Sequence, residues 1–328
     1  MIRSTLRFAP AALLAAMTVS ATLVCAQQQV PPAPPQEPSA PAPSSAPTFP
    51  KPDPARFTAT SPSKDLVNAF LQASWGYDDS RIWQVQAIMK TTVEGISKVI
   101  VVVADKTGKQ KPAALQFLAL ADGKHIIADN EIIAFGEHPF AENRAILQQR
   151  ADGPYRGSAV KDLELVEFAD FQCPHCKEAQ ATMEKLAVDF PKARIVFQNY
   201  PLPQHAAARN AAAYGACVAK LGGNDAFFGF ASTVFDGQDG LATPDGATLT
   251  LNSAVTKAGL DPAKVSACVA TQATNDGIDA SIKLAQDLNI NQTPMLLVNG
   301  RMVPIGGAPY ATVKQVIDYQ AKLDGVAK

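Results

Sequence analysis

The apolar positions of this 328-residue chain follow helix and strand periods from about residue 60 onward. Ser63 is a candidate N-cap for a helix whose apolar residues recur on one side. Asp122-Gly123 is a hairpin signal between two apolar runs. The strand-like runs after the helix are 82–89, 98–104, 114–121 and 125–135. This pattern predicts a helix on a small antiparallel sheet, an α+β domain for binding or dimerisation that we place at 60–150.

A different order of elements follows, in residues 151–328. One strand is expected at 163–168, then a helix after a C-x-x-C segment, then a second strand at 193–200. The sequence from about 203 to 288 is mainly helical. The remaining elements are strands at 295–299 and 301–305 and a final helix that carries Val313, Val316 and Ile317. The order β, α, β, helical insert, β, β, α predicts an α/β fold.

The first 59 residues lack a core-forming pattern. Arg3 and Arg7 precede a short apolar stretch, and small residues end at Ala26, so we interpret 1–26 as a cleaved secretory signal peptide. Residues 27–59 are rich in Pro and Ala, which predicts a disordered linker, either a spacer or a tail without a specific role. Export places the protein in the periplasm or another extracytoplasmic space. The less favoured alternatives are a lipidated Cys25 and an uncleaved membrane anchor.

Composition narrows the classes of function. The chain has 29 Lys and Arg against 30 Asp and Glu, a net charge of −1, which argues against a nucleic-acid binder. Hydrophobic residues make up 47% of the chain, enough to bury a core. Only the N-terminal segment approaches membrane-spanning length, so a polytopic membrane protein is excluded. After cleavage four cysteines remain, an even number in an oxidising compartment.

The segment Cys173-Pro174-His175-Cys176 is the strongest chemical signal, because it follows a strand and begins a helix. A helix N-terminus favours an anion, so Cys173 is expected to be the nucleophilic thiolate, with Cys176 one turn further on and buried. Pro174 suits the first helical position, and His175 can stabilise the thiolate by a hydrogen bond or its charge. One alternative is half of a zinc site, but such a site needs a second pair of ligands. The other is a structural disulfide, but a bond that closes a loop of only four residues adds little stability. We expect no metal and no cofactor, since the dithiol is itself the redox group.

The segment Phe168 to Cys176 resembles the active-site segment of DsbA-like thiol–disulfide oxidoreductases of the thioredoxin fold, and Gln292 to Gly300 resembles their cis-proline loop. The resemblance implies a thioredoxin-like fold with a helical insertion. It also implies that Pro294 is a cis-proline beside the dithiol and that Thr293 pairs with an extended substrate strand. Glu167 would be a buried acid that assists proton transfer at Cys176, the alternative being an ordinary outward-facing strand residue.

The resemblance has implications for the insert as well. Some relatives carry a second disulfide there, and in an exported protein Cys217 and Cys268 would pair, since no other partner remains; two free buried thiols are the alternative. His205 lies in a segment that resembles the start of the insert, and we expect it to make a structural hydrogen bond. Residues 121–127 loosely resemble the N-terminal dimerisation domain of DsbC-like isomerases, which implies a possible homodimer.

Three functions follow as hypotheses. The first is a dithiol oxidase that transfers its disulfide to exported proteins with cysteines and is reoxidised by a quinone-linked membrane partner. The second is a dimeric isomerase or reductase, supported by the N-terminal unit and by Thr293, which resembles the residue before the cis-proline in isomerases. The third is a non-catalytic holdase that uses the groove beside Pro294. The dipeptide Pro174-His175 favours the oxidase.

Overall fold

The computed structural model describes residues 47–108 and 111–326. The expected signal peptide, Cys25 and the linker up to residue 46 therefore lie outside the described residues. Ordered contacts begin before residue 60, because Phe57 packs on the first core and forms a bridge to Ile88. The backbone N–H groups of Thr58 and Ala59 both donate to the Ile88 carbonyl. The end of the expected linker is thus attached to the first sheet.

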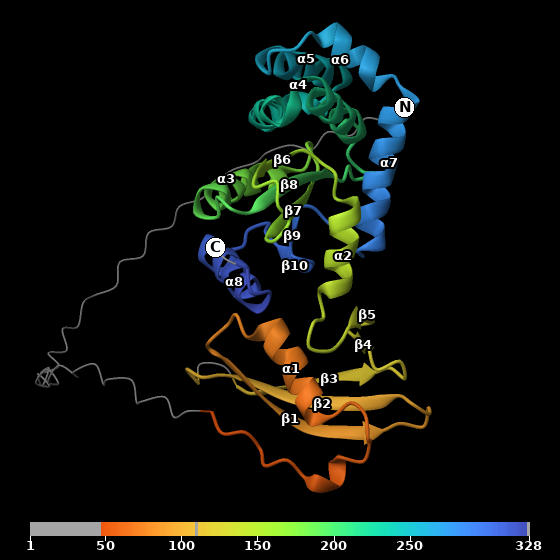
Figure 1. Cartoon of the computed structure of the whole chain (residues 1–328), viewed down its shortest axis with the longest axis vertical. Coiled ribbons are helices and arrows are strands. Elements are labelled where there is room, and N and C mark those ends of the chain that lie inside the picture. The colour runs from red at the N-terminus through yellow and green to blue at the C-terminus, as the bar shows by residue number, and fades with distance from the viewer. Residues whose placement is uncertain (1–46, 109–110, 327–328) are drawn as a thin grey trace, which may run out of the picture. The chain divides into compact units, whose positions relative to one another are not determined.

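The N-terminal unit is a helix packed on an antiparallel sheet, as expected (Figure 1). The Ser63 hydroxyl accepts a hydrogen bond from the Leu66 N–H, which caps α1 (Lys64–Trp75). The sheet has the order β1-β2-β3-β4-β5. Its strands are β1 (Arg81–Lys90), β2 (Ser97–Asp105), β3 (Ala113–Ala119), β4 (His125–Ala128) and β5 (Glu131–Ala134). Val67, Phe70 and Leu71 of α1 form its core with alternate residues of the strands.

The expected single strand at 125–135 is wrong, because the chain turns back within it. Asp129 and Asn130 have positive φ angles of 49° and 66°, and they join β4 to β5 as a tight hairpin. Asp and Asn tolerate this left-handed region better than most residues. The turn could therefore have been predicted from Asp129-Asn130, which separate the apolar pairs 126–127 and 132–133.

The second unit is built on a mixed sheet with the strand order β10-β9-β7-β8-β6. Its strands are β6 (Tyr155–Gly157), β7 (Glu164–Ala169), β8 (Arg194–Asn199), β9 (Met295–Val298) and β10 (Arg301–Pro304). The central strand β7 runs parallel to β8 and antiparallel to β9. The order of elements agrees with the sequence pattern, except for the three-residue edge strand β6 and the helix α2 (Ala141–Arg150), which the pattern did not show. Residues 141–150 were expected in the N-terminal domain, but Leu147 of α2 packs in the core of this second unit.

Helices cover both faces of this sheet. Successive side chains of β7 point to opposite faces, so alternate residues pack against different helices. Leu165 faces α3 (Pro174–Asp189) and α8 (Tyr310–Leu323). Val166 and Phe168 face the opposite way, toward α2 (Ala141–Arg150) and α7 (Gln272–Asp287) (Figure 1). All six residues of β7 are buried, so any polar side chain on this strand lies inside the protein.

The helical insert covers the end of β7 from which the active-site loop leaves. It consists of α4 (Ala208–Asp236), a short 3-10 turn η2 (Gln238–Ala242), α5 (Pro244–Lys257) and α6 (Pro262–Val269), and it continues into α7. Phe171 lies inside its aromatic core, with ring centroids 5.2–6.3 Å from four neighbouring Phe rings. The insert and the active-site loop therefore share one hydrophobic core.

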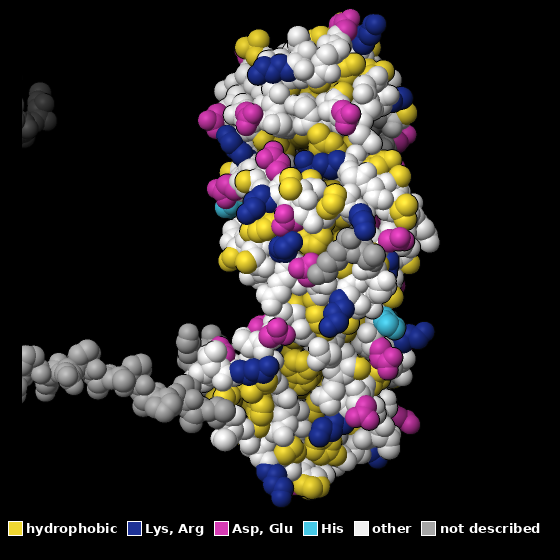
Figure 2. All heavy atoms as spheres, turned by 60° about the vertical axis from the view of Figure 1, so that its left-hand side comes forward, with side chains coloured by type: hydrophobic (Ala, Val, Ile, Leu, Met, Phe, Trp, Pro, Cys, Tyr) yellow, Lys and Arg dark blue, Asp and Glu magenta, His cyan; other side chains and the backbone are white. Residues whose placement is uncertain are grey.

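No helix in the described part of the chain is both long and apolar enough to cross a membrane. On the face shown in Figure 2, Lys and Arg side chains are interspersed with Asp and Glu. This mixed pattern is in keeping with the near-zero net charge of the whole sequence.

Candidate active site

The two thiols of the C-x-x-C segment lie where β7 leads into α3. Cys173 is the N-cap residue of α3, with extended backbone angles, and Pro174 takes the first helical position. Proline fits there because its missing N–H would have no partner in the helix. The Cys173 residue is 4% exposed and Cys176 is fully buried, so only Cys173 offers any surface to a second protein.

The electrostatics of the two thiols differ sharply. Hydrogen bonds lower the pKa of Cys173 to about 5; the largest comes from the Cys176 thiol, and the backbone N–H groups of Cys176 and His175 add smaller ones. Burial, followed by the hydrogen bond to Cys173, raises the pKa of Cys176 well above its usual range. At neutral pH Cys173 is therefore a thiolate and Cys176 remains a thiol.

The wall opposite Cys173 is the loop before β9. The Thr293–Pro294 peptide bond is cis, as expected from the resemblance. Cys173 Sγ lies 3.6 Å from the Thr293 carbonyl oxygen, to which the thiol can donate a hydrogen bond only when it is protonated. The Thr293 hydroxyl is buried and has no hydrogen-bond partner among the described residues, which leaves it available to a thiolate.

Gly306 follows β10 and keeps the surface beside this wall open. A Cβ atom on Gly306 would lie 3.5 Å from Pro294 Cδ and 3.8 Å from His175 Cβ. Any larger side chain would therefore occupy the space next to the dithiol. Gly306 was not singled out from the sequence, and its position beside the dithiol became visible only in the structure.

Glu167 lies inside the protein, on the face of β7 that α3 covers. Its side chain is 3% exposed, and burial raises its pKa to about 7, against the opposing effects of Gln180 and Arg156. The Gln180 amide donates to Glu167 Oε1 at 3.0 Å and to the Cys176 carbonyl at 3.1 Å. The alternative of an outward-facing strand residue is therefore wrong.

Asp170 is a site residue that sequence reasoning missed. Its buried carboxylate accepts hydrogen bonds from the N–H groups of Gln172 and Leu202 and from the ring of His205, at 2.7–2.8 Å. Its own N–H donates to Cys176 Sγ at 3.4 Å. The hydrogen bond expected of His205 is thus confirmed. In the sequence, Asp170 could have been noticed as an acidic residue three positions before the nucleophilic Cys173.

The His175 ring is placed differently from our expectation. It is exposed, and its Nδ1 lies 3.1 Å from the Glu178 carboxylate. Through its side chain, His175 contributes to an exposed ion pair; its contribution to the Cys173 pKa comes from the backbone N–H. The reason is local, because residues i and i+3 of a helix face the same side.

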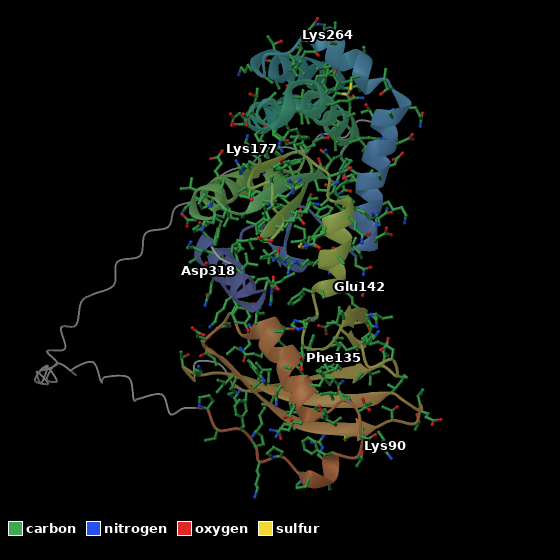
Figure 3. The ribbon with its side chains drawn as sticks, in the orientation of Figure 1. Lys90, Phe135, Glu142, Lys177, Lys264 and Asp318 are labelled. Carbon is green, nitrogen blue, oxygen red and sulfur yellow. A yellow bond between two sulfur atoms is a disulfide. The ribbon has the colours of Figure 1, made fainter. Side chains whose placement is uncertain are left out.

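The other two cysteines of the described chain are joined. Cys217 of α4 and Cys268 of α6 form a disulfide across 51 residues of sequence, visible as the yellow bond in Figure 3. It links helices within the insert, whereas Cys173 and Cys176 are both free and buried. In the part of the chain that the structure describes, no group of three or more His, Cys, Asp or Glu residues is arranged to hold a metal ion.

The fold and the site together define a class: a thioredoxin-like protein with a helical insertion, whose dithiol begins a helix opposite a cis-proline. The family model described as Thioredoxin matches residues 150–319, more than half of the sequence, so the chain belongs to this family. This confirms the thioredoxin-fold resemblance stated from the two motifs.

Among solved structures, the chain is similar to a periplasmic thioredoxin-like protein from Salmonella enterica serovar Typhimurium, with 20% identity and a TM-score of 0.46 over 55% of this chain and 97% of that one. It is similar to a thioredoxin-like oxidoreductase from Silicibacter pomeroyi, with 23% identity and a TM-score of 0.47 over 55% and 98%. A curated relative, a Na(+)/H(+) antiporter from Salinispora tropica, is 29% identical over 44% of this chain. This chain spans only 21% of that relative's length.

Proposed function

We propose that this protein is an exported dithiol oxidase, which passes the Cys173–Cys176 disulfide to the cysteines of other exported proteins. The observation that carries the proposal is the pair of opposed thiols, with a thiolate at Cys173 and a buried thiol at Cys176. A stabilised thiolate favours the reduced form of the pair, and this makes the disulfide form a stronger oxidant.

The reaction passes through a mixed disulfide. A substrate thiolate attacks Cys173 Sγ, the Cys173–Cys176 bond breaks, and Cys176 leaves with the electron pair. In this proposal Glu167, whose pKa burial raises to about 7, supplies the proton that Cys176 takes up. A second substrate thiolate then attacks the substrate sulfur of the mixed disulfide, and Cys173 leaves as a thiolate. Two electrons have passed to the dithiol, and a quinone-linked membrane protein would remove them.

The substrate is expected to lie along the Thr293–Pro294 loop. An extended peptide there would have the Cys173 sulfur on one side and the open surface at Gly306 on the other.

The oxidase is tested by mixing the oxidised protein with a reduced, unfolded secretory protein and following disulfide formation. Wild type should oxidise it in stoichiometric amount and Cys173→Ser should not; equal rates for both would refute the proposal and favour a holdase.

A disulfide isomerase is the second candidate, and the N-terminal α+β unit favours it. That unit has its own core, and Ile132 on the terminal strand β5 is 62% exposed. An apolar edge strand of this kind is suited to pairing with another chain. A dimer in analytical ultracentrifugation, together with repair of a scrambled substrate that the oxidised form cannot repair, would support this function over the oxidase.

A further inference from the structure

Two glutamines connect the active-site loop to the helical insert. One belongs to the insert and bonds the main chain of the loop, and the other belongs to the loop and bonds the main chain of the insert and of the residue before it. Gln238 of η2 donates through its amide nitrogen to the carbonyls of Phe171 and Cys173, both at 2.9 Å. Gln172 of the loop donates to the Leu241 carbonyl at 3.2 Å and accepts from the Ala207 N–H at 2.8 Å. Each segment thus supplies a side chain to the main chain of the other.

Gln238 contacts the reacting residue itself through the main chain. Its side chain is buried, with 9% of the residue exposed. The Cys173 carbonyl that it binds also accepts the N–H groups of Cys176 and Lys177, at 3.1 and 3.3 Å, in the first turn of α3. Gln238 therefore holds the peptide unit from which the Cys173 side chain extends into the N-terminus of the helix.

We propose that Gln238 is a positioning residue of the dithiol: by fixing the carbonyls of Phe171 and Cys173, it sets the thiol–disulfide equilibrium of the Cys173–Cys176 pair. The inference rests on the proposed function only in that this pair exchanges with other thiols. It assigns the insert a direct effect on the dithiol, in addition to its packing on the loop.

The direction of the effect follows from the thiolate's donors. The backbone N–H groups of His175 and Cys176 stabilise the Cys173 thiolate only while its sulfur stays at the start of α3. Without Gln238 the two carbonyls lose a donor and the loop gains freedom. The reduced form then loses stabilisation relative to the disulfide, so the disulfide becomes a weaker oxidant.

The test is the equilibrium with glutathione, measured on the full-length mature protein. In this reaction the disulfide takes two electrons from two glutathione molecules, and oxidised glutathione and the dithiol form. Gln238→Met keeps the size of the side chain and removes both N–H donors. We expect it to lower the equilibrium constant about three- to tenfold and to raise the Cys173 pKa by roughly half to one unit. The control is Gln286→Met, an exposed residue of α7, which should change neither value.

Circular dichroism and thermal unfolding show whether each variant is folded. If Gln238→Met does not fold, Gln238→Glu provides the same comparison, since it keeps the length and places a carboxylate against the two carbonyls. A folded variant with the wild-type equilibrium would overturn the proposal, and so would the loss of folding in both variants, which would make Gln238 purely structural. A reducing wild-type potential would instead refute the oxidase, while the comparison of Gln238→Met with wild type would still test Gln238.

Discussion

Glu167 and Cys176 are joined through the amide of Gln180, which donates to the Glu167 carboxylate at 3.0 Å and to the Cys176 carbonyl at 3.1 Å. One strand and one helix thereby connect a buried acid to the main chain of the residue that carries the buried thiol. The acid has a pKa near 7 because it is buried, so it changes protonation state in the pH range where the protein works. In the proposed reaction, Glu167 is the proton acceptor for Cys176.

Replacing Glu167 with Gln should slow the step in which Cys176 attacks a mixed disulfide. The acceptor for the Cys176 proton is lost, and we expect a rate reduction of at least about a hundredfold, in the range typical of general acid–base groups. The measurement is the release of glutathione from a mixed disulfide at Cys173, followed between pH 5 and pH 9. Wild type should show an inflection near pH 7 that Glu167→Gln lacks. An inflection retained in the variant would exclude Glu167 as the acceptor.

The same substitution should increase stability at alkaline pH. The carboxyl ionises near its ordinary pKa of 4.5 in the unfolded chain but near 7 in the folded one, so stability falls as pH rises through this window and is constant above it. Glu167→Gln removes the penalty, roughly 2–4 kcal/mol above pH 7. Urea unfolding of the reduced protein at pH 5 and pH 8 measures it. A stability difference between variant and wild type that does not change with pH would contradict the buried, uncharged state of Glu167.

Cys176 is expected to determine the acidity of Cys173. Its thiol provides the largest of the hydrogen bonds that lower the Cys173 pKa to about 5. Cys176→Ala should therefore raise that pKa by about one unit or more, since one pKa unit corresponds to roughly 1.4 kcal/mol. The rate of Cys173 alkylation against pH gives the value, and Cys173→Ser serves as the background control. An unchanged pKa would assign the effect to the other donors, Thr293 and the backbone N–H groups of the helix.

The Cys217–Cys268 disulfide should stabilise the insert without taking part in exchange. Closing a loop of 51 residues corresponds to about 4 kcal/mol in the chain-entropy model. The double variant Cys217→Ala, Cys268→Ala should lose stability of that order in chemical unfolding. Its glutathione equilibrium at Cys173 and Cys176 should match that of wild type. A shifted equilibrium in the folded double variant would show that the second disulfide is coupled to the first pair.

Removing the carboxylate of Asp170 should be strongly destabilising. It is 1% exposed and receives three hydrogen bonds, one from Gln172 within the active-site loop and two, from Leu202 and His205, that tie the loop to the segment before α4. Asp170→Ala leaves these donors buried without a partner, and we expect a loss of about 3–5 kcal/mol. His205→Ala removes only one of the donors and should cost less. Equal losses for the two variants would show that the ring contact dominates.

Most of the second unit could be predicted from the sequence, because its elements alternate clearly and its two motifs are specific. The C-x-x-C helix and the helical insert follow from local patterns, and the cis-proline follows from the resemblance to the family's loop. The short edge strand β6 could not be found, because three residues carry no period. The hairpin at Asp129–Asn130 was missed because its apolar flanks read as one strand.

The chemistry around the thiols was only partly predictable. The two cysteines were recognisable from their place at the start of the helix, and Glu167 from the resemblance to the family. The direction of the His175 ring depends on Glu178, a residue one turn away that the motif does not include. Gln238 acts through contacts with residues that are distant in sequence, so no local pattern could assign it. Asp170 could be noticed from its place three residues before Cys173, but its bonds to Leu202 and His205 are visible only in the structure.

The central claim is that the Cys173–Cys176 pair is a disulfide donor, and its reduction potential tests that claim most directly. The potential is obtained from the thiol–disulfide equilibrium with glutathione by trapping free thiols. The thiolate at Cys173 predicts a value closer to about −120 mV, as in strongly oxidising relatives, than to about −270 mV, as in thioredoxin. A value near −270 mV would contradict the oxidase and indicate a reductase or an isomerase kept reduced by a membrane partner.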